Sequence, residues 1–333
     1  MKNSLRWGLL SLGLAATTAY AGPITTTLYF TNYASHQIQS TKGTYTGNGT
    51  VGNGTFTLTA PNVITTTPGA DGIVRNPNNG DLLIGGQSNA VYQVNPNTGT
   101  FTTATPGVQA YHLAVDPNKN VVWASGIPGA LSAVPINPFG GAGTVKSITN
   151  SVTGFGQNIT SLAFTPSNGV FFTDAGPSGY GDFGSINLTT GVATVLLSGV
   201  AAAHGMVYDP FSGDLILGGS DQITQIDPTT GTIVSSATFL GNAFDQGAVD
   251  GLGHIFWASN NGQLFFMDYS TTNLVGSTGN FVSDNFYQGN LDDVAPLIGA
   301  GGTSTSTPVP EPGTLALLGL GFASLVASRR RKT

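Results

Sequence analysis

Side chains that could hold a ligand recur at one offset in this chain. Six positions stand five residues ahead of a repeated turn, and they are Asp71, Tyr111, Thr160, His204, Asp245 and Tyr287. In three repeats the next position adds His112, Gln246 and Gln288. Carboxylate, imidazole and phenol groups gathered around one point could bind Ca²⁺ or another divalent cation, or could hydrogen-bond sugar hydroxyls. The alternative is a solvated, hydrogen-bonded rim without a ligand.

Motifs for catalysis are scarce by comparison. The single Glu, Glu311, lies near the C-terminus, so only Asp could supply the carboxyl pair of a glycosidase. The chain has no HExxH zinc motif, no GxSxG nucleophile elbow and no phosphate-binding P-loop, and the absence of Cys removes thiolate chemistry. The sequence therefore favours a protein without catalytic activity. A metal-dependent hydrolase or lyase that uses Asp71, His204 and Asp245 is the alternative.

Charged residues are few and unevenly placed. Asp, Glu, Lys and Arg make up 8% of the 333 residues, against about a quarter in an average soluble domain. Between the two ends of the chain, fifteen Asp face only Lys42, Arg75, Lys119 and Lys146. A body with this balance would repel phosphate backbones, so we expect no nucleic-acid partner. Hydrophobic residues still account for 40% of the chain, which is enough for a packed core.

The elements that must position the candidate side chains form a repeat. A hydrophobic strand followed by a turn recurs in residues 72–77, 113–117, 162–166, 205–210, 247–251 and 289–293. Successive turns are 40 to 49 residues apart, which is the length of a four-stranded β-propeller blade. A second apolar run follows the turns, Pro, Asn, Asp and Gly separate the runs, and helical periodicity is missing. The pattern predicts an all-β fold.

A higher-order repeat sets the number of blades. Residues 70–86 align without gaps with residues 203–219, three blades later, and nine of seventeen positions are identical. A three-blade unit duplicated in tandem gives six blades. Residues 28–32 look like a second strand that lacks a first, and residues 286–293 look like a first strand that lacks a second. We therefore predict a six-bladed β-propeller over residues 22–298, closed by pairing of these N- and C-terminal strands.

Several repeated residues have a structural interpretation. Asp116, Asp209 and Asp250 occupy the turns, where a carboxylate accepts hydrogen bonds from its own backbone. Trp123 and Trp257 stand on equivalent second strands. We expect both indoles to pack between blades rather than to form a platform for a sugar ring.

The N-terminal end has the layout of a signal peptide. Residues 1–21 place Lys2 and Arg6 ahead of an apolar run and end in the cleavage sequence Ala19-Tyr20-Ala21. A buried helix is the alternative, but such a helix would carry polar positions on one face. We therefore expect the mature protein to begin at Gly22.

The C-terminal end is a second processing signal. A Gly/Ser/Thr linker over residues 299–308 leads to residues 309–333, which contain an apolar helix over 314–328 and a basic tail over 329–333. A helix of this length barely spans a hydrocarbon core of about 30 Å. Because basic flanks stay on the cytoplasmic side, the body is expected to face away from the cytoplasm.

This tail closely resembles the PEP-CTERM sorting signal of Gram-negative bacteria, because the sequence Pro310-Glu311-Pro312, the short helix and the basic run follow one another in the family's order. The resemblance implies recognition by an exosortase and an inner-membrane intermediate held by the helix. After removal of the helix, it implies delivery to the periplasm, the cell surface or the extracellular matrix. It also implies a host that makes exopolysaccharide.

The body, with its Asp-Pro and Asn-Pro turns and Thr-Gly hairpins, resembles NHL, YncE-like and streptogramin-lyase-like propellers over residues 24–298. Lactonase-type six-bladed propellers hold Ca²⁺ with a Glu that has no counterpart in this body. We therefore expect an exported propeller that binds a polysaccharide or another exported protein, without an assigned cofactor.

Overall fold

Strands joined by tight turns make up the fold of this computed structural model. It describes residues 23–46, 55–118, 120–126, 130–150, 159–175, 180–201, 204–277, 281–284 and 290–297. The expected signal peptide, the linker and the sorting tail lie outside these residues. One 3₁₀ turn, η1 (Val275–Ser277), is the only helical element within the described ranges. The predicted all-β class is confirmed.

Three separate sheets of the predicted blade type follow one another along the chain. The first contains β5 (Ile73–Arg75), β6 (Leu82–Gly85), β7 (Val91–Val94) and β8 (Phe101–Ala104). The second contains β9 (Leu113–Asp116), β10 (Val121–Gly126), β11 (Ala130–Pro135) and β12 (Thr144–Ser147). The third contains β14 (Ile159–Phe164), β15 (Val170–Ala175), β16 (Tyr180–Asn187) and β17 (Val192–Ala201), with β13 (Thr149–Asn150) parallel to β17. Within each blade the consecutive strands are antiparallel.

The fourth and fifth blades share a strand. They are built from β18 (Gly205–Tyr208), β19 (Leu215–Asp227), β20 (Thr232–Val249), β21 (His254–Ser259), β22 (Gln263–Asp268) and β23 (Phe281–Asp284). In β19, residues 215–218 pair with β18, whereas Ser220 and residues 222–227 pair with β20 around Asp221, which has a φ of 59°. In β20, the first part pairs with β19 and the last part, from Phe244 onward, pairs with β21. The sequence pattern predicted short, separate strands here, and instead one strand passes from the fourth blade into the fifth.

The sixth blade is built from both ends of the body. The innermost strand β24 (Leu291–Val294) pairs antiparallel with β1 (Ile24–Asn32), with Phe30 opposite Val294. β1 pairs with β2 (Gln37–Thr46), which in turn pairs with β3 (Thr55–Leu58) and β4 (Asn62–Thr66). The predicted closure is confirmed for residues 290–294, whereas residues 286–289 of the expected strand lie outside the described part of the chain.

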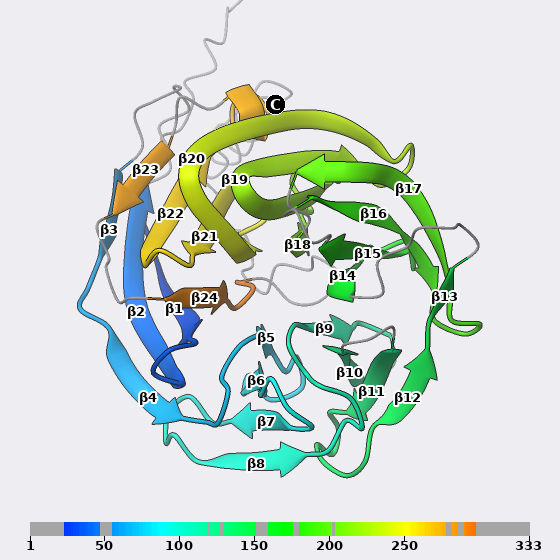
Figure 1. Ribbon diagram of the computed structural model, residues 1–333. Coiled ribbons are helices and arrows are strands. Elements are labelled where there is room, and N and C mark those ends of the chain that lie inside the picture. Colours follow the sequence, from blue (N-terminus) through cyan, green and yellow to red (C-terminus); the bar gives the residue numbers. More distant parts are fainter. Residues whose placement is uncertain are drawn as a thin grey trace, which may run out of the picture. The chain divides into compact units, whose positions relative to one another are not determined.

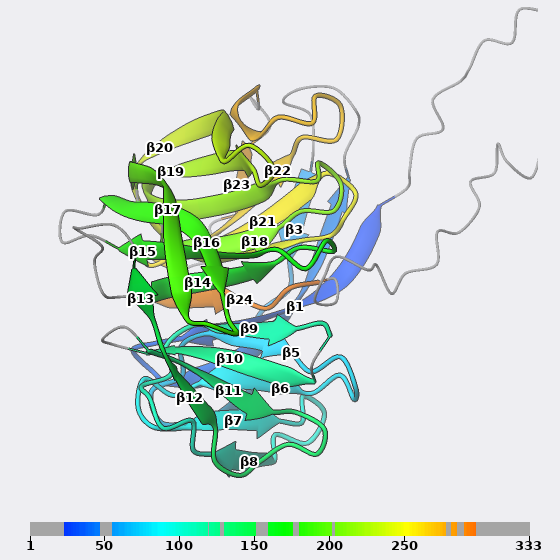
Figure 2. The same ribbon diagram turned by 90° about the vertical axis from the view of Figure 1, so that its right-hand side faces the viewer.

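The six innermost strands close a ring (Figure 1). Contacts run in order from β5 to β9, β14, β18, β20 and β24, and from β24 back to β5. Figure 2 shows the ring from its side, with the inner strands β5 and β9 of neighbouring blades next to each other. The start of each innermost strand therefore lies close to the axis of the ring, and side chains that precede or begin these strands can meet there.

The hydrophobic core lies between the blades. Innermost and second strands such as β9 and β21 are buried throughout, whereas the outer strands β8 and β12 are mostly exposed. Trp123 and Trp257 are both buried in such clusters, which confirms their expected role in the core. Gly218 and Gly247 border the Trp257 ring at distances that leave no room for a Cβ atom.

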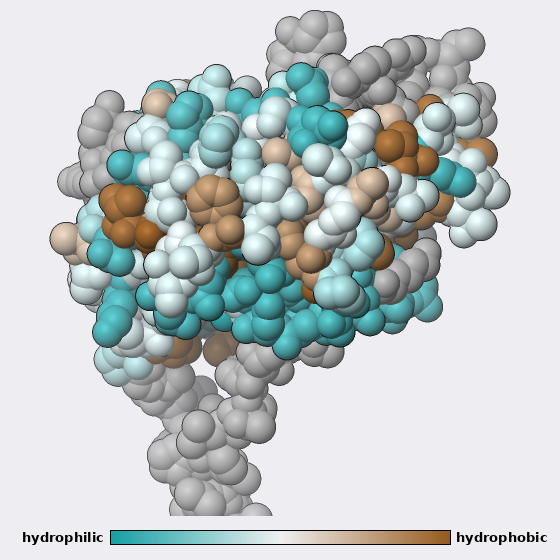
Figure 3. Space-filling view, turned by 90° about the horizontal axis from the view of Figure 1, so that it is seen from below, coloured by the Kyte–Doolittle hydropathy of each residue, from teal (hydrophilic) through white to brown (hydrophobic). Residues whose placement is uncertain are grey.

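The outer surface is weakly charged. Nine of the fifteen Asp are buried, namely Asp71, Asp116, Asp174, Asp209, Asp245, Asp250, Asp268, Asp292 and Asp293. Figure 3 shows one side of the ring, where hydrophobic residues are scattered among polar ones and hydrophilic residues gather along one edge. No helix in the described ranges has the length and apolar character needed to cross a membrane.

Candidate functional site

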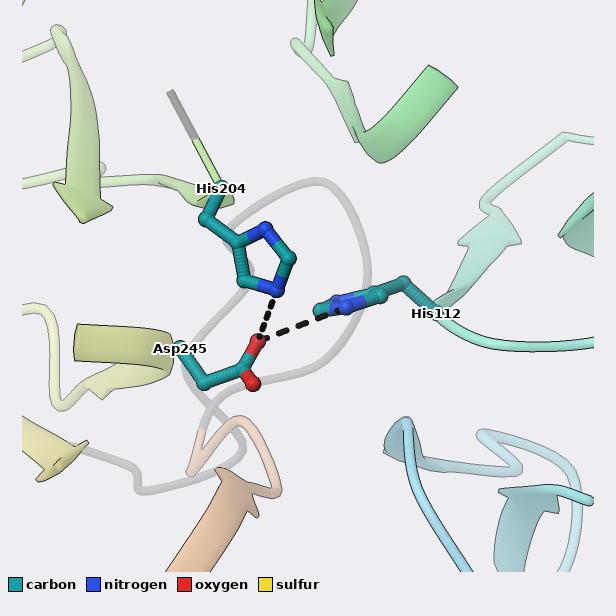
Figure 4. A group of neighbouring side chains, drawn as sticks. All are labelled: His112, His204 and Asp245. Atoms are coloured by element: carbon teal, nitrogen blue, oxygen red, sulfur yellow. Dashed lines mark ion pairs between the residues drawn. The ribbon is translucent and has the colours of Figure 1, made fainter. Parts of the chain in front are cut away.

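Residues at the starts of the innermost strands meet at the axis of the ring. His112 immediately precedes β9, His204 immediately precedes β18, and Asp245 lies within β20 (Figure 4). Asp71 stands two residues before β5, and Asp292 and Asp293 lie in β24. We call these six residues the axial cluster. Its members come from five different blades, so the closed ring is required to assemble them.

Two imidazoles converge on one carboxylate oxygen in the axial cluster. His112 Nε2 lies 3.3 Å from Asp245 Oδ1, and His204 Nε2 lies 3.4 Å from the same atom. The two rings are nearly perpendicular, with centroids 5.1 Å apart. Figure 4 shows both rings pointing toward Asp245 from different sides. His112 and Asp245 are buried, and the His204 side chain is 39% exposed.

The other edge of His112 faces a second group of carboxylates. His112 Nδ1 lies 3.6 Å from Asp293 Oδ2, and Asp71, His112 and Asp293 each offer a ligand atom within 4.8 Å of the others. Asp71 Oδ2 accepts a hydrogen bond of 2.8 Å from Gln87 Nε2, and Asp293 Oδ1 accepts one of 2.9 Å from the Gln246 backbone N–H. These bonds hold the two carboxylates in place around the imidazole.

Burial dominates the protonation of three of the carboxyl groups. It raises the pKa of Asp292 and of Asp293 well above the usual aspartate value, and the charges of Asp245 and Asp71 raise both further. Burial likewise raises the pKa of Asp71. For Asp245, burial also favours the neutral form, but the positive charge of the neighbouring imidazoles outweighs it and holds the pKa of Asp245 below its usual range.

The two histidines respond in opposite directions. The charge of Asp245 outweighs the effect of burial on His204 and raises the pKa of that imidazole to about 9. Burial instead lowers the pKa of His112, although Asp245 and Asp71 both favour its charged form. The cluster therefore holds an ionised carboxylate beside one imidazole that tends to carry a proton and one that tends to be neutral.

Several buried polar atoms in the axial cluster have no hydrogen-bond partner among the described residues. They are His112 Nδ1, Asp245 Oδ1, Asp292 Oδ2, Asp293 Oδ2 and, next to them, Gln246 Oε1. Buried polar atoms are nearly always paired, because each unpaired atom costs about 1–3 kcal/mol. Within the described ranges no Lys or Arg forms an ion pair with these carboxylates, whose ion-pair partners are the two histidines. The geometry suits a cation.

The structure brings together three of the six residues singled out by their offset. Asp71, His204 and Asp245 all belong to the axial cluster, in which ligand atoms of His112, His204 and Asp245 lie within 4.8 Å of one another, as do those of Asp71, His112 and Asp293. His112 is therefore common to both groups.

The remaining three residues have other positions. Tyr111 is half-buried and joins two blades through its backbone carbonyl, which accepts a hydrogen bond of 3.0 Å from Gly72 N–H. Thr160 is half-buried, with its hydroxyl 3.2 Å from that of Thr173. Tyr287 and Gln288 lie outside the described residues.

The alignment of the repeats placed Tyr287 level with Asp245, and this register of the last blade is wrong. β20 and β24 pair in parallel with Gln246 opposite Asp293, so Asp292, and not Tyr287, lies level with Asp245. The sequence offered one signal that could have corrected the register. Two consecutive acidic residues follow the apolar Leu291, whereas the other repeats with an acidic turn have a single Asp there.

The predicted turn aspartates are confirmed in their role. Asp116, Asp209 and Asp250 each accept a hydrogen bond from the backbone N–H two residues later, at 2.9, 3.1 and 2.8 Å. Asp209 and Asp250 also accept a hydrogen bond from a buried tyrosine of the neighbouring blade. These aspartates therefore stabilise the ring and are not part of the axial cluster.

Comparisons with known proteins identify the tail and the fold. The PEP-CTERM protein-sorting motif matches residues 308–332. No curated protein sequence matches the chain. The extracellular domain of a one-component system protein from B. thetaiotaomicron is similar, with 16% sequence identity and a TM-score of 0.47. The alignment covers 76% of this chain and 33% of that one, so this chain spans about a third of that chain's length. A chain of the mitotic checkpoint complex is similar at 13% identity and a TM-score of 0.50, covering 89% of this chain and 90% of that one.

The likeness to the mitotic checkpoint complex chain concerns the fold alone at this identity. The sorting motif carries more information, because it marks an exported protein that is sorted by an exosortase through a membrane-anchored stage in Gram-negative bacteria. The chain thus joins a closed β-propeller to a PEP-CTERM protein-sorting motif.

Proposed function

We propose that the protein is a non-catalytic propeller that binds a polysaccharide of the cell surface or extracellular matrix after exosortase processing. The main support is the nearly neutral, hydroxyl-rich perimeter of the ring, which the outer strands of the blades form. The outer strands β3, β4, β8, β12, β17 and β23 and residues 232–243 of β20 contain only two charged residues, Lys146 and Asp284. Exposed threonines lie along this perimeter, including Thr57, Thr102, Thr144, Thr194 and Thr232.

A neutral perimeter suits a polyhydroxylated partner. Hydroxyl groups donate and accept hydrogen bonds, so rows of threonines can pair with sugar hydroxyls without desolvating a charge. The axial cluster cannot serve a long polymer in the same way, because five of its six members are buried. The likeness of the turns to NHL, YncE-like and streptogramin-lyase-like propellers is compatible with binding, but it is a likeness of blade-building residues.

The test uses the protein isolated from its own host and that host's exopolysaccharide. Co-sedimentation and a glycan array should detect binding that depends only weakly on salt, because screening acts on charges. The triple variant Thr102→Glu, Thr144→Glu, Thr194→Glu should weaken binding, since it places three carboxylates on the perimeter.

A matched control places the same charge elsewhere. Thr98→Glu, Thr189→Glu and Thr229→Glu change exposed residues at hairpin turns between third and fourth strands. That variant should bind normally. If the wild-type protein binds none of the glycans but binds one exported protein of the host in a direct assay, the partner is a protein and the polysaccharide proposal is wrong.

A metal-dependent hydrolase or lyase is the second candidate. It is favoured by His112, His204 and Asp245, which present two nitrogens and one oxygen within 4.8 Å of one another. Three protein ligands leave a coordination position for a water molecule, whose pKa a bound Zn²⁺ lowers to about 7. Degradation of the host's polysaccharide by the wild type, but not by His204→Ala, would favour this candidate over simple binding.

A further inference from the structure

We propose that His112, His204 and Asp245 bind one divalent ion of a first-row transition metal, such as Zn²⁺, at the axis of the ring. The proposal goes beyond polysaccharide binding at the perimeter, and either can fail without the other. It joins residues from three blades that are up to 133 positions apart in the sequence.

The distances in the cluster match those between ligands of one metal ion. Two ligands that each lie about 2.0–2.2 Å from a tetrahedral metal are separated by about 3.3–3.5 Å. Both Nε2 to Oδ1 distances, 3.3 Å for His112 and 3.4 Å for His204, fall in this range. A direct charge-assisted hydrogen bond would be shorter, at about 2.7–2.9 Å. The three atoms are thus spaced as ligands rather than as a tight ion pair.

The donor atoms decide the class of metal. Ca²⁺ and Mg²⁺ are bound by oxygen ligands, whereas imidazole nitrogen suits Zn, Cu, Fe and Ni. Two imidazoles and one carboxylate therefore favour a first-row transition metal over the Ca²⁺ that the sequence suggested first. A set of two His and one carboxylate is also common among metal sites that keep an open position.

Residues behind the ligands complete the site. Metal-bound histidines usually direct their second nitrogen at a carboxylate or carbonyl group. His112 Nδ1 faces Asp293 Oδ2 at 3.6 Å, and both atoms are buried without a hydrogen-bond partner among the described residues. Asp293 would orient the His112 ring and increase the basicity of Nε2. These unpaired atoms are the observation, independent of the ligand distances, that points to a bound cation.

The charge of the axial cluster also favours a bound cation. Four carboxyl groups and two imidazoles share a buried region in which no Lys or Arg of the described residues pairs with them. Without a cation, only protons on the carboxyl groups and the imidazoles can reduce the repulsion between the carboxylates. A divalent ion would supply the missing positive charge directly. Its route to the site is through His204, the cluster's only partly exposed member.

The experiment measures the metal itself in the mature protein purified from its host. Elemental analysis of the isolated protein should give about one equivalent of a transition metal. After removal of metal with a chelator, titration with Zn²⁺ should show one site and raise the melting temperature. Ca²⁺ and Mg²⁺ at the same concentration should not change the melting temperature. Co²⁺ is a spectroscopic probe, and its visible absorption should indicate nitrogen and oxygen ligands.

Three variants assign the ligands. His204→Ala removes the partly exposed ligand and should reduce Zn²⁺ affinity at least about tenfold, because even outer-shell changes cost about 10- to 100-fold. Asp245→Asn keeps the shape of a buried ligand and should weaken binding at least as much. His36→Ala is the matched control, because His36 is exposed in a turn outside the cluster. It should bind Zn²⁺ like the wild type.

Each outcome decides the proposal. If the isolated and chelator-treated proteins both fail to bind Zn²⁺, Mn²⁺ and Co²⁺, the cluster is neutralised by protons and the proposal is wrong. If Zn²⁺ binds but His204→Ala and Asp245→Asn bind it as tightly as the wild type does, the ion lies elsewhere and the assignment is wrong. Because His204 is partly exposed, its variant should fold even where Asp245→Asn does not.

Discussion

At the scale of residues, the aspartates of this protein perform two different tasks. Some close turns and receive hydrogen bonds from tyrosines of the next blade, as Tyr45 Oη does by donating to Asp250 Oδ2 at 2.8 Å. Others surround the histidines at the axis. Because both groups are buried, the acidic composition is mostly used inside the molecule, and the surface is closer to neutral than the formal charge suggests.

The Tyr45 to Asp250 bond should contribute measurably to stability. Tyr45→Phe removes a buried donor while keeping the ring, which packs against His254 and Phe256. We expect the free energy of unfolding to fall by about 1 kcal/mol, the net contribution of one hydrogen bond, because Asp250 Oδ2 keeps its 2.7 Å contact with His254 Nδ1. Urea unfolding followed by fluorescence measures the change. The control is Tyr92→Phe, since the Tyr92 hydroxyl forms no hydrogen bond within the described ranges, and an equal loss there would contradict the interpretation.

His254 should make stability depend on pH. Burial opposes its charged form, but the hydrogen bond and charge of Asp250, 2.7 Å from Nδ1, and the charge of Asp268 outweigh burial and raise the pKa of His254. A histidine pKa raised by folding adds stability that is complete below about pH 6.5 and is lost as pH rises through the folded-state pKa.

We therefore expect the free energy of unfolding to decrease from about pH 6 to about pH 9, and His254→Gln to reduce that decrease. Urea titrations across this range compare the variant with the wild type and with His36→Gln. His204, whose pKa is raised to about 9, titrates in all three proteins and cancels in the comparison. An identical pH dependence in His254→Gln and the wild type would contradict the prediction.

At the scale of elements, the long strand β20 depends on close packing at glycine. It leaves the fourth blade and enters the fifth, where Gly247 lies opposite Trp257. A Cβ atom at Gly247 would meet Trp257 Cε3 at 2.5 Å. The Trp257 Nε1–H in turn donates a 2.8 Å hydrogen bond to the Asp245 carbonyl, so the position of the indole and that of the axial strand are linked.

Gly247→Ala should consequently destabilise the fold and disturb the axial cluster. We expect the free energy of unfolding to fall by about 1–3 kcal/mol from overpacking, together with weaker binding of Zn²⁺ at the axial cluster. Gly43→Ala is the control in another strand, because its nearest neighbour is the flexible end of Leu28 at 3.2 Å. Thermal unfolding of both variants tests the prediction, and equal melting temperatures would argue against tight packing at Gly247.

At the scale of the whole molecule, the ring depends on pairing between its two ends. Asn32 in β1 lies opposite Leu291 in β24, 259 positions later, and the Asp293 N–H donates to Thr31 Oγ1 at 3.2 Å. The axial cluster needs this closure, because β24 supplies Asp292 and Asp293. Closure also removes strand edges that would otherwise pair with other chains.

Paired cysteines can report on this closure, since the chain has none of its own. The double variant Asn32→Cys, Leu291→Cys should form an intramolecular disulfide when oxidised, because opposite residues of antiparallel strands have Cα atoms about 4.5–5.5 Å apart, within the range that a disulfide bridges. Mass spectrometry of the digested protein identifies the crosslinked peptide. Asn32→Cys combined with Ala124→Cys, on the second strand of another blade, should remain reduced and monomeric. A crosslink only between molecules would contradict closure within one chain.

The parts of the fold that could be predicted are those encoded locally. Turns of Asn-Pro, Asp-Pro and Thr-Gly recur at blade spacing, and each strand between them is apolar, so strands such as β6, β9 and β18 could be placed from the sequence. The passage of β20 between two blades could not be predicted, because the same residues can pair as one strand or as two. Which of these occurs depends on the neighbouring strands.

The axial cluster shows the limit of local patterns more clearly. The repeat pattern predicts a turn at Asp292 and Asp293 because Asp is a turn former, and only the parallel pairing of β24 with β20 places them inside the ring.

The sequence by itself determined the sorting motif, the six repeats and their closure, since each depends on residue order over short distances or on repetition. Only the tertiary structure decided which polar side chains meet. His112 and Asp245 lie 133 positions apart, and closure of the ring brings them to 3.3 Å and removes the water that would otherwise solvate them.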